Sequence, residues 1–157
     1  MSVRGGATSG KRVLAIASGG GHWEQLQLLR GAFDGHDVHF ATTLAGLGER
    51  AGLTRVTIVP DCNRNEPVRA VASLFAILRL LVRVRPAVVI STGALPGVIA
   101  LALGRRLGAR TIWVDSIANA ETMSMAGLKA KRYADLWLSQ WPDVAREFGA
   151  EYAGSVL

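Results

Sequence analysis

The chain has 157 residues and contains 18 Lys and Arg against 12 Asp and Glu, which gives a formal net charge of +6 at pH 7. Half of the residues are hydrophobic and only 19% are charged, so the composition supplies a core and excludes an intrinsically disordered chain. The length suits one domain and is too short for two complete α/β domains. A single cysteine, Cys62, excludes an internal disulfide framework and fits a reducing cytoplasm.

The positive charge favours an anionic partner, such as a nucleotide sugar, a lipid phosphate or an anionic membrane surface. Nucleic acid is disfavoured, because the basic residues are scattered, with little aromatic interleaving and no RNA-binding signature. No stretch of about 20 apolar residues is present, so we expect no membrane-spanning helix. Residues 1–11 lack the apolar run of a secretory signal, and we expect a flexible leader there and one domain over residues 12–157.

From residue 12 onward, apolar strands alternate with helical stretches. In chain order, we expect a strand at 12–17, a helix at 22–33, a strand at 37–42, a short helix at 45–51, a strand at 55–59, a long helix at 67–85, a strand at 87–91, a helix at 97–107, a strand at 111–114, a helix at 128–134 and a strand at 136–139. This alternation is typical of βαβ units. It predicts a Rossmann-like α/β fold, with a mostly parallel sheet and helices on both faces.

Three loops of suggestive composition follow the first, fourth and fifth strands, at residues 18–23, 92–97 and 115–122. In open parallel sheets, ligands bind at the carboxyl ends of the strands, near the point where the strand order reverses. We therefore expect the three loops to line one site.

The first loop begins Ser18-Gly19-Gly20-Gly21-His22 and leads into a helix. Glycines let the backbone turn sharply and approach a ligand, and a helix start presents free N–H groups to an anion, so the loop predicts a nearby phosphate or diphosphate. The alternative is a tight turn without a ligand. A dinucleotide fingerprint is disfavoured, because its third glycine would fall on Glu24.

Polar side chains in these loops are candidates for catalysis and binding. His22 can act as a general base, hydrogen-bond a phosphate, or only cap the helix. Asp115, Ser116 and Asn119 follow a buried strand, where they suit sugar hydroxyls, base catalysis or helix capping. The second loop, with Gly93 and Gly97, is either part of the site or an ordinary turn. We expect no metal, because His36 and His39 resemble a metal pair only superficially: His39 lies in an expected strand and Cys62 is a lone thiol. We also expect no cofactor.

The long third helix, residues 67–85, carries arginines on an otherwise apolar surface. At about 100° per residue, Arg69, Arg79 and Arg83 share one narrow face. One interpretation is a helix buried between the sheet and its neighbours, with arginines at the rim. The other is a helix lying in the headgroup boundary of a membrane, with its arginines on lipid phosphates.

Three motifs in order, SGGGHWEQLQLL, STGALPG and VDSIANAETMSMAGLKAKRYADLWLSQWPD, resemble the PssD-type exopolysaccharide glycosyltransferase subunits. They are also similar to the membrane-anchoring subunit of the eukaryotic UDP-N-acetylglucosamine transferase of dolichol-linked N-glycan synthesis. The resemblance covers about residues 12–157. The eukaryotic subunits lack the Trp-Glu-Gln run found here, and they carry an amino-terminal membrane anchor that we do not expect in this sequence. Both differences favour the bacterial branch.

The resemblance implies the amino-terminal half of a MurG-like GT-B glycosyltransferase. Such a half binds a polyprenyl-diphosphate-linked sugar acceptor, while a PssE-like partner subunit binds the UDP-sugar, which carries glucuronic acid or N-acetylglucosamine. The implied reaction is a metal-independent, inverting sugar transfer in polysaccharide biosynthesis. The implied location is cytoplasmic, peripheral on the inner face of the plasma membrane.

Carried over by motif, the glycine turn and His22 would face the acceptor diphosphate or the cleft between the two halves. Gly93 and Gly97 would form a second wall of this cleft, and Asp115, Ser116 and Asn119 a third. We expect the catalytic base to be His22, with Asp115 and Glu24 as further candidates. Two alternatives remain: a non-catalytic membrane-docking scaffold for a catalytic partner, and a free-standing nucleotide-binding module.

Overall fold

Six strands form one parallel sheet in the computed structural model, which describes residues 10–156. The strand order is β3-β2-β1-β4-β5-β6, the Rossmann order, which reverses between β1 and β4. The strands are β1 (Arg12–Ile16), β2 (Asp37–Thr42), β3 (Val56–Ile58), β4 (Val88–Ser91), β5 (Arg110–Val114) and β6 (Leu136–Leu138). The predicted fold class is confirmed, whereas the leader expected at residues 1–11 lies almost wholly outside the described residues.

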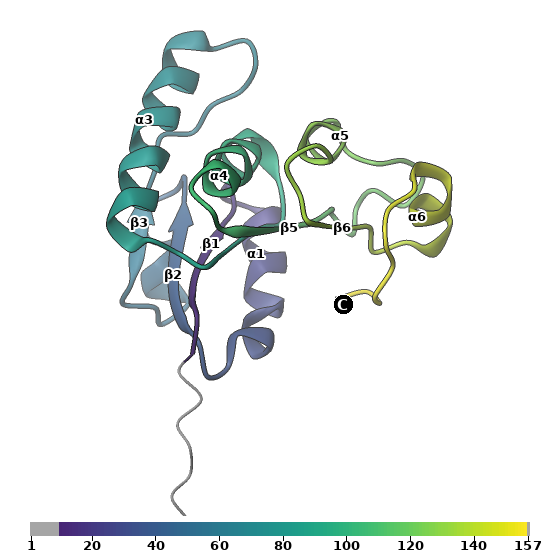
Figure 1. The fold of residues 1–157 in the computed structure, drawn as a ribbon, viewed down its shortest axis with the longest axis horizontal. Helices are drawn as coiled ribbons and strands as arrows, with labels where there is room; N and C mark the ends of the chain where they lie inside the picture. The colour runs from purple at the N-terminus through teal and green to yellow at the C-terminus, as the bar shows by residue number, and fades with distance from the viewer. Residues whose placement is uncertain (1–9, 157) are drawn as a thin grey trace, which may run out of the picture.

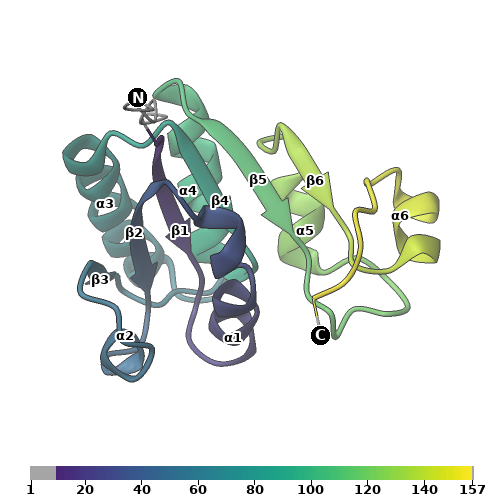
Figure 2. The ribbon, with the colours of Figure 1, turned by 90° about the horizontal axis from the view of Figure 1, so that it is seen from below.

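Helices cover both faces of the sheet (Figures 1 and 2). They are α1 (Gly21–Leu28), the 3-10 helix η1 (Arg30–Phe33), α2 (Leu47–Arg50), α3 (Pro67–Val84), α4 (Ala94–Arg106), α5 (Met125–Ala130) and α6 (Pro142–Phe148). One core lies under α3, α4 and α5, where Ile77 and Leu101 pack against sheet residues such as Trp113. The other core lies under α1 and α2, with Trp23 and Leu47. This burial on both faces explains why the strands read as continuous apolar runs.

Several helix boundaries differ from the sequence expectation. The stretch predicted as one helix at 22–33 is α1 followed by the short 3-10 helix η1. The helix α4 begins at Ala94 rather than at residue 97, so that Gly97 lies inside the helix and not in a turn. The helix α5 begins earlier than expected because the Ser124 hydroxyl caps it, accepting the N–H of Gly127 at 2.8 Å.

The helix α6 was absent from the sequence expectation. Pro142 occupies its first turn, and Gly149 ends it with a φ of 73°, in the left-handed region. These two residues are therefore the sequence signals of a helix that is only seven residues long.

The helix α3 is buried along only one side, through Ser73, Ile77, Leu80 and Leu81. Its amino-terminal half projects beyond the rest of the fold (Figure 1), and there Val68 is 82% exposed and Phe75 63% exposed. The interpretation of α3 as a helix buried by its neighbours is therefore wrong for this half. Across residues 10–156, no helix combines the length and the apolar character needed to cross a bilayer.

Candidate functional site

A cavity of about 390 Å³ opens at the carboxyl ends of the strands, on both sides of the point where the strand order reverses. Its lining comes from the loops after β1, β2 and β3 and from the start of α4. We call it the switch-point cavity, and its lining residues are Ser18, Gly19, Thr43, Leu44, Asp61 and Ala94. In an open α/β sheet, this is the position at which ligands bind.

The glycine turn forms one wall of this cavity. The N–H of Gly19 donates to Thr43 Oγ1 at 3.0 Å, and a Cβ on Gly19 would lie 2.9 Å from the Cβ of Leu44. Gly20 has a φ of 85°, which strains any other residue. Gly21 has neither constraint, because a Cβ there would meet nothing within 4 Å. Gly21 therefore leaves the start of α1 open to a ligand.

The exposed start of α1 offers backbone N–H groups. The first intrahelical bond runs from the N–H of Glu24 to the carbonyl of Gly20, so the N–H groups of the three preceding residues have no partner within the helix. Across residues 10–156, no side chain caps this end. Free N–H groups beside Gly21, around which space is open, suit an anionic group of a ligand.

His22 joins the loops that flank the reversal of strand order. Thr92 Oγ1 donates to the His22 carbonyl at 2.6 Å, and the imidazole fills the space where a side chain on Gly93 would stand. Its Nδ1 is enclosed and has no hydrogen-bond partner in the described part of the chain. A histidine base of the Ser-His-Asp type has a carboxylate on this nitrogen. Residues 10–156 provide no such carboxylate to His22.

The loop after β4 takes part in the cavity only through Ala94. This residue has a φ of 68°, a left-handed conformation that non-glycine residues rarely adopt and that is typical of functional sites. Gly97 is buried instead, because a Cβ there would overlap Ser91 Oγ and lie 3.3 Å from the ring of Trp113. Gly97 therefore serves helix packing, whereas the sequence had placed it at the wall of a cleft.

The third loop is folded around Asp115, which is only 2% exposed. One carboxylate oxygen accepts from Trp113 Nε1 and Ser124 Oγ, and the other accepts from Asn119 Nδ2 and the N–H of Ser124. Both oxygens are thus fully used within the loop, so Asp115 stabilises the loop instead of offering a free oxygen to a substrate. The sequence expectation of a cleft-facing base does not match this placement.

A hydrogen-bond network, which we call the glutamine network, ties the third loop to α1 and to the last described residues. Gln25 donates to Ser116 Oγ at 2.9 Å and accepts from Gln140 Nε2 at 2.7 Å. Gln140 Oε1 in turn accepts the N–H of Val156 at 2.9 Å. Sequence reasoning missed both glutamines. The available signal was Gln25, a polar residue between the apolar Trp23 and Leu26 on the inward side of α1.

Glu24 is separated from the switch-point cavity. It lines a different cavity, between α1 and α2, together with Gln27, Arg30 and Arg50. The structure therefore does not bring Glu24 to the residues with which it was grouped as a catalytic candidate.

Asp61 is the acidic residue that lines the switch-point cavity. One of its carboxylate oxygens accepts the N–H of Cys62 at 2.9 Å, and Asp61 forms no salt bridge with any residue in 10–156. Sequence reasoning did not single out Asp61 as a candidate site residue. Its position directly after the third strand, at the same edge of the sheet as the other loops, was the available signal.

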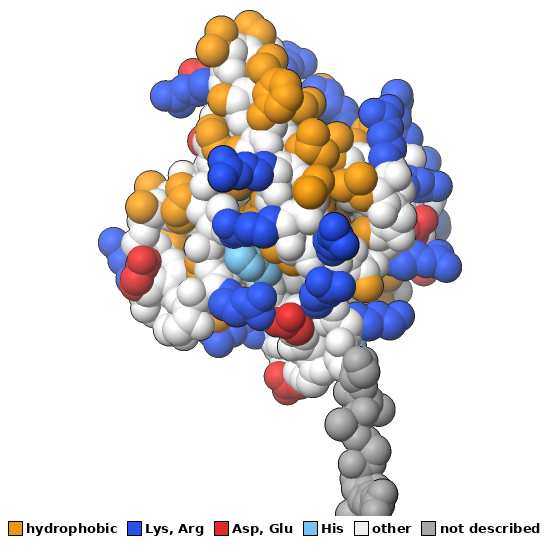
Figure 3. Space-filling model, turned by 60° about the vertical axis from the view of Figure 1, so that its left-hand side comes forward, with side chains coloured by type: hydrophobic (Ala, Val, Ile, Leu, Met, Phe, Trp, Pro, Cys, Tyr) orange, Lys and Arg blue, Asp and Glu red, His pale blue; other side chains and the backbone are white. Residues whose placement is uncertain are grey.

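The exposed side of α3 carries an apolar stripe bordered by arginines (Figure 3). The α3 apolar stripe consists of Val68, Val71, Leu74, Phe75 and Val82, all exposed. On the adjoining side, Arg83 donates to Thr57 Oγ1 at 3.3 Å, and the same hydroxyl lies 2.7 Å from His39 Nε2. Burial, together with the nearby Arg55 and Arg83, lowers the pKa of His39. Basic side chains, among them Arg55 and Arg83, therefore flank the α3 apolar stripe.

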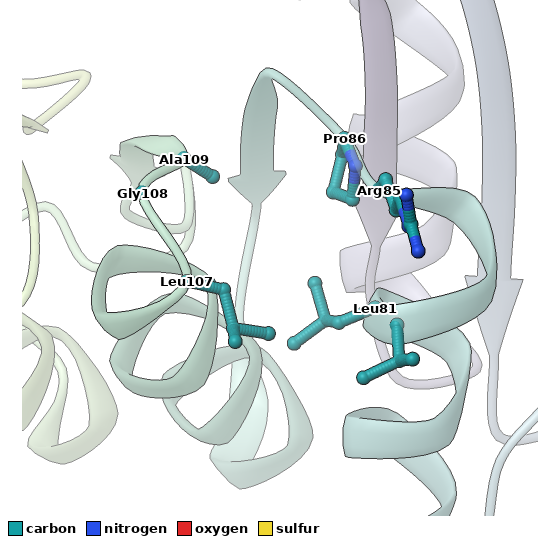
Figure 4. A pocket seen from close by; sticks show the side chains of 8 residues that line it. Leu81, Arg85, Pro86, Leu107, Gly108 and Ala109 are labelled. Carbon is teal, nitrogen blue, oxygen red and sulfur yellow. The ribbon is translucent and has the colours of Figure 1, made fainter.

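A third cavity, of about 370 Å³, lies at the opposite edge of the sheet, between the carboxyl-terminal ends of α3 and α4. Leu81, Arg85, Pro86 and Leu107 point into it (Figure 4). Because ligands of such sheets bind at the carboxyl ends of the strands, this cavity is not the candidate site. Within residues 10–156, no group of three or more His, Cys, Asp and Glu is arranged to hold a metal ion.

Comparison with known proteins supports a relationship to glycosyltransferases. No family model matches the chain. The UDP-N-acetylglucosamine transferase subunit ALG14 of Eremothecium gossypii is 28% identical over 191 aligned residues, covering 94% of this chain and 82% of the relative.

Among solved structures, MurG of Acinetobacter baumannii matches with a TM-score of 0.72 and 16% identity, over 93% of this chain and 45% of MurG. A putative UDP-N-acetylglucosamine 2-epimerase of Listeria monocytogenes matches with a TM-score of 0.69 and 10% identity, over 92% of this chain and 43% of the epimerase. At these identities the likeness concerns the fold alone. The chain spans less than half of each solved protein, in agreement with the amino-terminal half of a GT-B glycosyltransferase.

Proposed function

We propose that this chain is the acceptor- and membrane-binding subunit of a two-component inverting glycosyltransferase. The enzyme would transfer glucuronic acid or N-acetylglucosamine from a UDP-sugar to a polyprenyl-diphosphate-linked sugar in polysaccharide biosynthesis. Similarity to a transferase subunit along 94% of the chain, and a fold that matches 45% of MurG, support a half-enzyme. A PssE-like partner would bind the UDP-sugar on the other side of the cleft.

The observation that carries the proposal is that a single loop connects the switch-point cavity to the exposed half of α3. Asp61 lines the cavity, and six residues later Pro67 begins α3. The intervening loop runs to the projecting end of the helix (Figure 1). A lipid-linked acceptor needs a polar site for its sugar and diphosphate and a surface that rests on the membrane, and this arrangement would supply both.

The membrane contact would be made by the α3 apolar stripe and its neighbouring arginines. Apolar side chains of a surface helix enter the headgroup boundary, while arginines reach lipid phosphates. Arg69, Arg79 and Arg83 lie next to the stripe on the helix surface, and all three are exposed. The chain would thus act from the inner face of the plasma membrane.

Inversion at the sugar requires a base near the acceptor hydroxyl and stabilisation of the departing UDP. His22 is our candidate base, because it lies at the start of α1 and bridges the loops after β1 and β4. Asp115 is a poorer candidate, since both of its oxygens already accept hydrogen bonds. The partner would hold the leaving UDP.

Co-expression with the product of a neighbouring reading frame tests this proposal. The purified pair is assayed for sugar transfer from UDP-glucuronic acid and UDP-N-acetylglucosamine to a polyprenyl-diphosphate-linked sugar. We expect transfer by the pair and none by either chain alone. Tight binding of a UDP-sugar by this chain alone, with no stimulation by any partner, would instead support a free-standing nucleotide-binding module.

The unpartnered Nδ1 of His22 favours a second candidate function, in which this chain is a membrane-docking scaffold without a catalytic residue. The variant His22→Ala distinguishes the two functions in the reconstituted pair. A loss of turnover of about 100-fold or more, with acceptor binding retained, fits a general base. Turnover close to that of the wild type fits the scaffold.

A further inference from the structure

We infer that Asp61 makes the switch-point cavity a site for the hydroxyl groups of the acceptor sugar and keeps the diphosphate out of it. The inference rests on the proposed function and assigns the two polar parts of the acceptor to two different places. The cavity takes the sugar, and the open start of α1 takes the diphosphate.

The charge of the cavity lining supports this division. Asp61 is the acidic residue among six lining residues, none of which is basic, and it has no ion-pair partner in residues 10–156. An uncompensated carboxylate repels a phosphate placed beside it. It also accepts strong, charge-assisted hydrogen bonds from hydroxyl groups. A sugar therefore fits this lining better than a phosphate does.

The remaining polar groups of the cavity suit a sugar as well. Ser18 and Thr43 contribute hydroxyl groups, which can both donate and accept hydrogen bonds. Thr43 Oγ1 is fixed by the N–H of Gly19, at 3.0 Å. A mixture of carboxylate and hydroxyl groups matches the alternating donors and acceptors of a sugar ring.

The diphosphate has a separate place next to the cavity. Gly20 and Gly21 do not line the cavity; they are exposed beside it, at the uncapped start of α1. Their N–H groups and the helix dipole favour an anion there. The glycine turn thus contributes Gly19 to the hydroxyl site and Gly20 and Gly21 to the anion site beside it.

The carboxylate of Asp61 is held in place by its own loop. One oxygen accepts the N–H of Cys62, whose side chain is buried, so the loop is anchored at the next residue. The variant Asp61→Asn keeps an oxygen for this hydrogen bond, removes the charge and replaces the other oxygen by an NH2 donor. The variant Asp61→Glu keeps the charge and serves as a second check if the first variant folds poorly.

The test measures equilibrium binding of two probes to the full chain, farnesyl diphosphate and farnesyl-diphosphate-linked glucose. We expect the wild type to bind the glycosylated probe about tenfold more tightly, as fits one charge-assisted hydrogen bond. Asp61→Asn is expected to bring this ratio to about one, partly by strengthening binding of bare farnesyl diphosphate. Asp61→Glu is expected to keep the weak binding of the bare diphosphate.

The control is Asp143→Asn, which removes an exposed carboxylate from α6, away from the cavity, and should leave the ratio unchanged. If the wild type binds both probes equally, or if Asp61→Asn preserves the preference, the inference is wrong and the proposed function survives. If the wild type binds neither probe, the proposed acceptor binding fails and the inference falls with it.

Discussion

Two of the three glycines after β1 are required by the fold, whereas Gly21 is not. Gly19 packs against Leu44, and Gly20 has a positive φ, but space is open around Gly21. The sequence motif alone could not separate these roles, because all three residues look alike in a run of glycines. In this glycine run, Gly21 is therefore the residue whose role is best explained by ligand binding.

Gly20→Ala and Gly21→Ala should therefore have opposite effects. Gly20→Ala is expected to lower the free energy of unfolding by about 1–3 kcal/mol because of its backbone strain. Gly21→Ala should keep or slightly raise it, since alanine is the better helix former, but should weaken binding of farnesyl diphosphate. Urea unfolding and equilibrium binding measure the two effects. Full binding by Gly21→Ala would show that the start of α1 is not the anion site.

Substitution of Asp115 tests whether this residue stabilises the fold or acts as a catalytic base. Asp115→Ala leaves four donors, one buried and three partly buried, without their acceptor, and we expect it to lower the free energy of unfolding by about 3 kcal/mol. His22→Ala, in contrast, removes a side chain that makes no hydrogen bond through Nδ1 and should cost far less. Urea unfolding of both variants measures this difference. An Asp115→Ala chain of normal stability that had lost turnover would restore Asp115 as a candidate base.

His39 should make stability depend on pH in the acid range. Its pKa is lowered in the folded chain by burial and then by Arg55 and Arg83, so the unfolded chain binds more protons just below pH 6.5. Stability is then fully present above the ordinary pKa and falls as the pH drops through it toward the lowered folded value. The free energy of unfolding, measured with urea, should fall less between pH 7.5 and pH 5.5 for His39→Gln than for the wild type. The exposed His36 provides the control, and an equal effect of His36→Gln would contradict the assignment.

At the scale of elements, the buried strands could be predicted well because each is a short apolar run between turn signals. The helix boundaries were harder, since they depend on tertiary contacts. The early start of α4 depends on the left-handed Ala94, and the start of α5 depends on the Ser124 cap. The surface of α3 was ambiguous for another reason. An apolar helix sequence does not reveal which side faces the core, and only the packing of Ile77 and Leu81 fixes it.

The α3 apolar stripe and the arginines beside it make a prediction about membranes. The triple variant of Arg69, Arg79 and Arg83 to Ala should bind phosphatidylglycerol vesicles about 100-fold more weakly, at about 1 kcal/mol for each basic residue. Val71→Ser with Phe75→Ser should weaken binding to phosphatidylcholine vesicles too, because the apolar contact is lost. Vesicle flotation measures both. Leu28→Ser, at an exposed site on α1, is the control, and an equal loss there would contradict the assignment to α3.

At the scale of the whole molecule, the three predicted loops do meet at one edge of the sheet, but they contribute unequally to the cavity there, whereas the sequence suggested that all three would line one site. The first loop lines the switch-point cavity, the second contributes only Ala94, and the third is tied up around Asp115. Asp61 and the glutamine network were missed because their roles arise from contacts between residues far apart in sequence. Gln25 and Gln140 are separated by 115 positions, for example.

The glutamine network links α1, the third loop and residues 155–156 into one unit. In the proposed enzyme, this unit would lie beside the cleft that the partner completes. The proposed function therefore assigns the lipid-linked acceptor to this chain and the nucleotide to the partner.

Equilibrium binding to the isolated chain tests this division most directly. Farnesyl-diphosphate-linked glucose and UDP-N-acetylglucosamine are titrated separately against the purified protein. We expect saturable binding of the lipid-linked sugar and no detectable binding of the UDP-sugar. Saturable binding of the UDP-sugar, with none of the lipid-linked sugar, would contradict it.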